Sequence, residues 1–131
     1  MVVSLINTHE YTFSVDEFGE PIVLKNGEAI ATVLARLLLL EPGTIQSHPE
    51  MGVGLVSKYR YSMEDNIKYL KEDFRNQIEK YLPQFQGVEV TAYLEKGVCY
   101  INATIDGVIY AFFYDVENDK LQSKFKKLNE L

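Results

Sequence analysis

The acidic side chains Glu41 and Glu50 are the residues of this sequence with the clearest potential for chemistry. They flank a stretch rich in proline and glycine, and glycosidases cleave sugar bonds with two carboxyl groups roughly 5–10 Å apart. Such a pair would suit a glycoside hydrolase. A plainer interpretation competes with it, because an acidic protein offers many carboxylate pairs and this chain has no tryptophan to form a sugar platform.

Metal chemistry and nucleophilic chemistry have no supporting pattern in the sequence. The two histidines, His9 and His48, and the single cysteine, Cys99, do not have the spacing of a metal site. No nucleophile elbow, phosphate-binding loop or dinucleotide fingerprint is present, and Gly52-Val53-Gly54 is only a fragment of the last. We therefore predict no catalytic residue, no metal and no cofactor, and we expect that the protein is not an enzyme.

The composition predicts one acidic globular domain. The chain has 131 residues, a net charge of -6 and 47% hydrophobic residues, which suits a single core. An acidic surface repels nucleic acid and anionic membranes on average, and the apolar run 30–40 is too short to span a bilayer. The single cysteine excludes an intrachain disulfide, and the N-terminus lacks a signal pattern. We therefore expect protein partners and a cytoplasm-like compartment.

Two helices are predicted to position the loop that carries the two carboxylates. Apolar residues recur at helical spacing from Asn26 to Leu40, and Pro42-Gly43 ends that segment. A second amphipathic face runs from Ile67 to Tyr81. Ser62 is the predicted N-cap, with Asp65 in the capping-box position and Pro83 as the stop. Residues 41–61 form the loop between the helices.

Three strands are predicted after the second helix. They cover 88–94, 99–105 and 108–114, and the dipeptides Lys96-Gly97 and Asp106-Gly107 form the turns. The third strand is apolar on both faces, which indicates that it is covered twice, within the domain or by a partner. At a sheet edge it could pair with a strand of another chain. The alternative is that a terminal segment of the same chain covers that edge.

The remaining segments are predicted to be extended termini around a core of residues 27–115. Residues 1–26 resemble an extended arm, because Tyr11, Phe13 and Val15 alternate with polar residues. Residues 116–131 form a polar tail, predicted as a short helix or an arm. The predicted fold is therefore a single α+β domain over residues 1–131, with two helices packed on a small, mainly antiparallel sheet.

The segment Lys58-Tyr59-Arg60-Tyr61 has two open interpretations. Aromatic and basic residues together are enriched at protein interfaces. The same residues could equally form a loop that packs over its own core. Because an ordered loop of this length is uncommon and usually functional, the whole of 41–61 is a candidate contact region.

The stretch 37–55 combines an apolar helix end with three short turn-forming blocks in a fixed order. These blocks are Pro42-Gly43, Pro49-Glu50-Met51-Gly52 and Gly54-Leu55. They resemble the signature of the baseplate wedge and sheath-initiator family of contractile-tailed phages, which also supplies a component of type VI secretion baseplates. Met51 stands where an aromatic residue is usual. The order downstream, a long helix, a proline and a β-meander, is also similar, so the resemblance covers about residues 27–115.

The resemblance implies a structural protein of a virion tail baseplate, assembled in the host bacterial cytoplasm. Its implied partners are other baseplate wedge proteins and tail sheath or tube subunits. The predicted partner-binding residues lie in the loop, at the end of the second helix and on the third strand: Glu41, Pro42, Gly43, Pro49, Glu50, Gly52, Gly54, Leu82, Pro83, Gln84, Tyr110, Phe112 and Tyr114. The family has also been labelled lysozyme-like, so a peptidoglycan hydrolase that uses Glu41 and Glu50 is one alternative. A cellular protein-binding module is another.

The sequence departs from the family pattern at the end of the second helix. Many members carry Glu-Pro-Arg there, whereas this chain has Leu82-Pro83-Gln84 and keeps only the proline. If the motif binds a helical bundle of neighbouring wedge proteins, as the family implies, the electrostatic part of that interaction must differ here.

Overall fold

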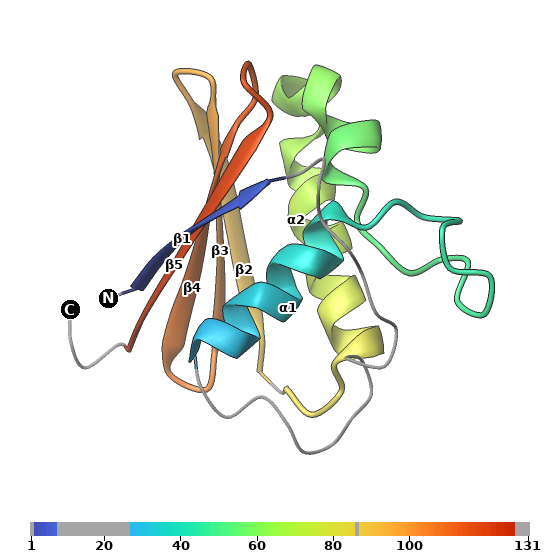
Figure 1. The fold of residues 1–131 in the computed structure, drawn as a ribbon, viewed down its shortest axis with the longest axis vertical. Helices are drawn as coiled ribbons and strands as arrows, with labels where there is room; N and C mark the ends of the chain where they lie inside the picture. Colours follow the sequence, from blue (N-terminus) through green and yellow to red (C-terminus); the bar gives the residue numbers. More distant parts are fainter. Residues whose placement is uncertain (1, 8–26, 86, 128–131) are drawn as a thin grey trace.

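The computed structural model describes residues 2–7, 27–85 and 87–127. These residues form an antiparallel sheet with two helices on one of its faces (Figure 1). The helices are α1 (Gly27–Leu39) and α2 (Met63–Tyr81). The strands are β1 (Val2–Asn7), β2 (Glu89–Glu95), β3 (Val98–Ile105), β4 (Val108–Asp115) and β5 (Lys120–Lys127). They lie in the order β1-β5-β4-β3-β2, and all neighbours are antiparallel. The predicted α+β class is confirmed.

Tight turns connect strands β2, β3 and β4. Lys96 and Gly97 have φ values of 51° and 78°, and Asp106 and Gly107 have φ values of 49° and 76°. Positive φ at both central residues characterises the type I′ turn, whose twist matches that of the flanking strands. The three strands predicted over 88–114 and both of their turns are therefore confirmed.

Both ends of the chain add a strand to this sheet, which corrects two predictions. The tail 116–131 contains β5 rather than a helix, and the arm 1–26 contains β1, which pairs with β5. Strand β4 is consequently hydrogen-bonded on both sides, so its interpretation as a sheet edge is wrong. The alternative, that a terminal segment of the same chain covers it, is confirmed, and that segment is β5. Within the described residues the two edges are β1 and β2. The alternating pattern of Tyr11, Phe13 and Val15 lies outside those residues.

The two faces of β4 have different surroundings. Tyr110, Phe112 and Tyr114 are buried between the sheet and the helices. The ring of Phe112 meets that of Phe74 on α2 edge-to-face, with 6.1 Å between centroids, a favoured aromatic geometry. The opposite face of the strand, with Phe113, is half-buried. The helices therefore supply one of the two covers that were predicted for this strand.

The helices bury complete apolar stripes against the sheet. The large side chains that lie fully inside are Leu34, Leu37 and Leu38 on α1, and Leu70, Phe74 and Ile78 on α2. Burying each such side chain stabilises the fold by about 1.5–3 kcal/mol before the loss of conformational entropy is counted. The spacing that predicted the two helices is thus the spacing of the core.

The loop between the helices is shorter than predicted. A π-helical turn, Leu55–Tyr59, and a 3₁₀ turn, Arg60–Ser62, lead directly into α2. Ser62 occupies the N-cap position as expected, but its side chain makes no capping bond to the helix. Its hydroxyl instead donates to the carbonyl of Lys58 at 3.2 Å. The first turn of α2 is therefore held by the preceding helical turns.

Candidate partner-binding site

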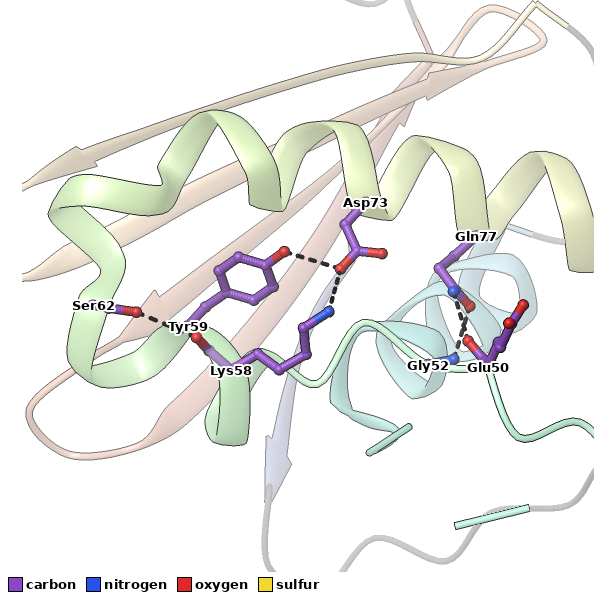
Figure 2. Close-up of polar contacts among 7 residues, drawn as sticks. All are labelled: Glu50, Gly52, Lys58, Tyr59, Ser62, Asp73 and Gln77. Carbon is purple, nitrogen blue, oxygen red and sulfur yellow. Dashed lines mark hydrogen bonds and ion pairs between the residues drawn. The ribbon is translucent and has the colours of Figure 1, made fainter. Parts of the chain in front are cut away.

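The segment Met51–Leu55 is the buried half of the loop. Met51, Val53 and Leu55 are at most 1% exposed and belong to the core. Gln77, on α2, holds this segment from the side: it accepts a hydrogen bond from the Gly52 amide at 2.7 Å and donates one to the Glu50 carbonyl at 2.9 Å (Figure 2). One amide side chain thus fixes the point where the loop enters the core.

The same segment completes the C-terminus of α1. The last carbonyl groups of a helix have no partner within it. The Val53 amide donates to the Leu37 carbonyl at 3.0 Å, and the Gly54 amide donates to the Leu40 carbonyl at 2.9 Å. Because these bonds replace missing helical ones, the loop backbone is positioned by α1 as well as by α2.

Glycine is required at position 52 for two reasons. Its φ is 114°, a conformation that L side chains rarely adopt, and a Cβ atom there would lie 2.2 Å from the Leu40 carbonyl oxygen. Gly54 also has a positive φ, 68°, immediately before the π-helical turn. Both glycines are buried. The structure thus places these two predicted contact residues in the scaffold rather than on the surface.

Residues 41–50 form the exposed half of the loop and project away from the helices and the sheet (Figure 1). The Gly43 amide donates to the Pro49 carbonyl at 2.8 Å, which ties the two ends of the projection together. Short turns within it are closed by hydrogen bonds from the amides of Thr44 and His48. Five predicted contact residues share this exposed projection: Glu41, Pro42, Gly43, Pro49 and Glu50.

The loop touches the last turn of α2. Lys80 donates a hydrogen bond to the Glu50 carboxylate at 3.1 Å, and this bond is the main reason why the pKa of Lys80 is raised. The rings of His48 and Tyr81 meet edge-to-face with 6.0 Å between centroids. These residues line a shallow hollow together with Pro49. Lys80 and Tyr81 were not among the predicted contact residues.

Of the three predicted residues at the end of α2, two are available at the surface. Pro83 and Gln84 are exposed, whereas Leu82 is fully buried. The Leu82 amide donates to the Ile78 carbonyl at 2.8 Å and so continues the helical bonding to the proline stop. The exposed loop meets the last turn of α2 at Lys80 and Tyr81, and the exposed Pro83 and Gln84 follow that turn in the chain. We call residues 41–50, Lys80, Tyr81, Pro83 and Gln84 together the loop surface.

The segment Lys58-Tyr59-Arg60-Tyr61 divides between the two interpretations. Lys58 and the hydroxyl of Tyr59 both donate to the Asp73 carboxylate, at 3.1 and 2.9 Å (Figure 2). Burial, followed by the contact with Asp73, raises the pKa of Tyr59 well above its ordinary value. Tyr61 points into solvent, with 87% of its surface exposed, and Lys58 is also exposed.

Arg60 joins the start of α2 to the turn between β4 and β5. Its guanidinium donates to the carbonyls of Val116 and Glu117 at 2.8 and 2.9 Å, and it lies 3.8 Å from the carboxylate of Asp119. The Tyr114 hydroxyl donates to the same carboxylate at 2.6 Å. Asp119 is only 5% exposed. The sequence did not indicate this cluster, because Arg60 lies 56 residues before Val116.

Three predicted contact residues are removed from the candidate site by their burial. Tyr110, Phe112 and Tyr114 are at most 2% exposed and face the helices. The sequence favours a partner contact there because β4 is apolar on both faces, but the structure shows that this face of the strand belongs to the core. They cannot touch a partner while the domain is folded.

The carboxylate pair has the environment of surface residues. Glu41 is exposed, and the Glu50 side chain is 80% exposed beside Lys80. A glycosidase general acid is kept protonated at neutral pH by an apolar pocket, and neither residue has one. Burial raises the pKa of Cys99 to about 12, which disfavours the reactive thiolate. Among the described residues, no three His, Cys, Asp or Glu side chains are placed to hold a metal ion.

Comparisons with protein-family models, curated proteins and solved structures gave no match. Within residues 2–7, 27–85 and 87–127, no helix is long and apolar enough to cross a membrane. The geometry of the loop surface, with the motif residues that form it, is therefore the feature of the molecule that bears on its function.

Proposed function

We propose that this protein is a structural component of a contractile-tail baseplate, which joins neighbouring wedge proteins and helps to initiate sheath or tail assembly. In this role the loop surface binds other wedge proteins, and the sheet lies toward tail sheath or tube subunits. The protein would be located in the baseplate of a virion tail, which is assembled in the host bacterial cytoplasm. No cofactor takes part.

One observation carries the proposal: the segment that resembles the wedge-family motif has a buried half, 51–55, and an exposed half, 41–50. Gly52 and Gly54 hold the buried half against Leu40 and Gln77. Residues 41–50 are held away from the core beside the end of α2. A preformed projection loses little conformational entropy on binding, which favours assembly into a large complex. The order of the motif residues thus supports contact with another protein, because the buried residues hold the exposed ones in a preformed segment.

The departure from the family's Glu-Pro-Arg pattern at 82–84 is compatible with a partner contact that has a different charge pattern. Leu82 lies in the core, so this position cannot offer the acidic side chain that many family members have. The nearby charges are Glu50 and Lys80, which are exposed and paired at 3.1 Å. An exposed ion pair contributes little to stability, because water and salt screen its charges. Both side chains can therefore change partners at little cost when another protein binds.

A peptidoglycan hydrolase is a weaker candidate for the same residues. It would need one protonated and one ionised carboxyl group facing a sugar. Glu41 and Glu50 are both exposed, and Glu50 is hydrogen-bonded to Lys80. Neither side chain has the apolar pocket that the general acid of such a pair needs.

Deletion of the gene, followed by electron microscopy of the particles, tests the proposal. We expect no assembled baseplates, or tubes without sheaths. Complementation then locates the surface: a Glu41→Lys, Glu50→Lys double variant should fail to restore assembly, whereas the control Glu72→Lys, exposed on α2 outside the loop surface, should restore it. Normal tails in the deletion strain would overturn the structural role.

The conservative double variant Glu41→Gln, Glu50→Gln separates the two candidate functions. It keeps side-chain size and hydrogen bonding but removes both carboxylates. Under the structural proposal, complemented particles assemble normally and a zymogram shows no lost activity. Normal tails that fail only at cell entry, together with loss of a lytic band, would instead support the hydrolase.

A further inference from the structure

The face of the sheet opposite the helices carries a row of aromatic side chains. Tyr93, Tyr100 and Phe113 lie in register on β2, β3 and β4. The rings of Tyr93 and Tyr100 are stacked with 4.7 Å between centroids, and Phe113 meets Tyr100 edge-to-face at 5.4 Å. Lys124 lies over Phe113 at 4.6 Å. Tyr93 is 49% exposed. Contiguous exposed aromatic side chains mark protein contact surfaces.

Charges of opposite sign border this aromatic row. On the open face, the charged residues of β2 are both acidic, Glu89 and Glu95. Those of β5 are all basic: Lys120, Lys124 and Lys126. Asp115, on β4, is the remaining acidic residue of the face among the four strands β2 to β5. The face is therefore acidic along one side and basic along the other.

The strand register places these charges in matching rows. Glu89 and Lys126 lie in one row across the sheet, and Glu95 and Lys120 lie in another row toward the opposite end of the strands. A two-fold axis parallel to the strands, between β3 and β4, exchanges β2 with β5 and keeps each row level. It therefore brings Glu89 of one copy to Lys126 of a second copy, and Glu95 to Lys120.

We propose that this open face binds a second copy of the chain, sheet against sheet. The same axis brings Tyr100 of one copy to Phe113 of the other, so the aromatic rows meet in the centre. An axis perpendicular to the strands would instead place β5 on β5 and oppose lysine with lysine. The charge pattern thus selects one of the two symmetric arrangements. The inference does not depend on the proposed contacts of the loop surface, because it uses the open face of the sheet.

The size of the face predicts a weak dimer. Strands lie about 4.8 Å apart and rise about 3.4 Å per residue, so four strands of seven residues cover roughly 450 Å². Two copies together would bury about 900 Å², which is below the roughly 1,200–2,000 Å² of a stable interface. We therefore expect a reversible dimer with a Kd on the order of 10–100 μM.

Sedimentation velocity of the whole chain, from about 1 μM to 1 mM, tests this arrangement. We expect a monomer to dimer transition that raised salt weakens, because the bordering ion pairs are exposed. Glu95→Lys and Lys120→Glu should each raise the Kd roughly tenfold, since every reversal acts twice in a symmetric dimer. The double exchange Glu95→Lys, Lys120→Glu should restore the original Kd, which no effect on a single chain would do.

Two tyrosines of similar exposure, 49% and 52%, provide a matched control. Tyr93→Ala removes an aromatic side chain from the open face, whereas Tyr69→Ala removes one that is 52% exposed on α2. Only the first should weaken the dimer, and circular dichroism should show that both variants are folded. A chain that stays monomeric at every concentration overturns the proposal. A dimer whose Kd is unchanged by Tyr93→Ala and by the charge reversals also overturns it. The same holds for a monomer that binds single-stranded nucleic acid or an acidic protein through this face.

Discussion

Gly52 combines two constraints that a single substitution can test. Replacing it with alanine forces a side chain into a φ of 114° and places its Cβ 2.2 Å from the Leu40 carbonyl oxygen. We expect Gly52→Ala to lower the free energy of unfolding by about 2–4 kcal/mol, because both the backbone and α1 must shift. Chemical denaturation followed by circular dichroism measures this loss.

Gly43 is the matched control for that prediction. Its φ is also in the left-handed region, 90°, but a Cβ atom there would meet no heavy atom within 4 Å. Gly43→Ala should therefore cost only about 1 kcal/mol, from backbone strain alone. Equal losses in the two variants would show that the contact with Leu40 does not matter.

The cluster of Arg60, Tyr114 and Asp119 shows which residues have a burial and partners that could not be predicted from the sequence. Asp119 has the composition of a polar turn residue, yet it is 5% exposed and accepts a hydrogen bond from Tyr114 at 2.6 Å. Nothing local indicates this, because Arg60 reaches it from another element. In contrast, the φ > 0 positions at Asp106-Gly107 were predictable, since they depend on two adjacent residues only.

At the scale of elements, the sequence predicted the helices and the meander but missed both terminal strands. Leu121 and Phe125 are spaced by four, which suits one face of a helix. Four is also even, so the same residues share one face of a strand. Both indeed lie on the core side of β5. The strand is decided by pairing with β4 and β1, and such long-range pairing leaves no local signal.

Strand β5 should therefore behave as core rather than as a dispensable tail. Leu121 is fully buried, whereas its neighbour Gln122 is exposed on the other face. Leu121→Ala should lower the free energy of unfolding by about 2–4 kcal/mol, because it leaves a cavity. Gln122→Ala should change it by less than about 0.5 kcal/mol. Urea denaturation of the dilute protein compares the two, and a small effect at Leu121 would contradict the five-stranded sheet.

At the scale of the whole molecule, the candidate site is a product of packing. The sequence motif singled out the loop, but only the structure separates buried Gly52 and Gly54 from exposed Pro42 and Pro49. The contact between Glu50 and Lys80 depends on how α2 lies beside the loop. Because these residues are 30 positions apart, the periodicity of either segment could not reveal that they form one surface.

The core also makes the stability of the whole domain sensitive to alkaline pH. Burial raises the pKa of Cys99 from 9.0 to about 12 and that of Tyr110 from 10.0 to about 12. In the unfolded chain both groups ionise near their ordinary pKa, while in the folded domain they stay protonated. Their contribution to stability is therefore complete below about pH 9 and declines as the pH rises toward 12.

Urea denaturation at about pH 8 and pH 10.5 measures this decline. One unit of pKa difference corresponds to about 1.4 kcal/mol, so the buried thiol alone should account for a loss of roughly 1–2 kcal/mol between these two values. Cys99→Ala should be less stable at pH 8 because of the cavity, yet lose less on the change to pH 10.5. Gln122→Ala is the control: it removes an exposed side chain that does not titrate, so it should leave the pH dependence unchanged. An equal decline in Cys99→Ala and the parent chain would mean that the buried thiol is not linked to folding.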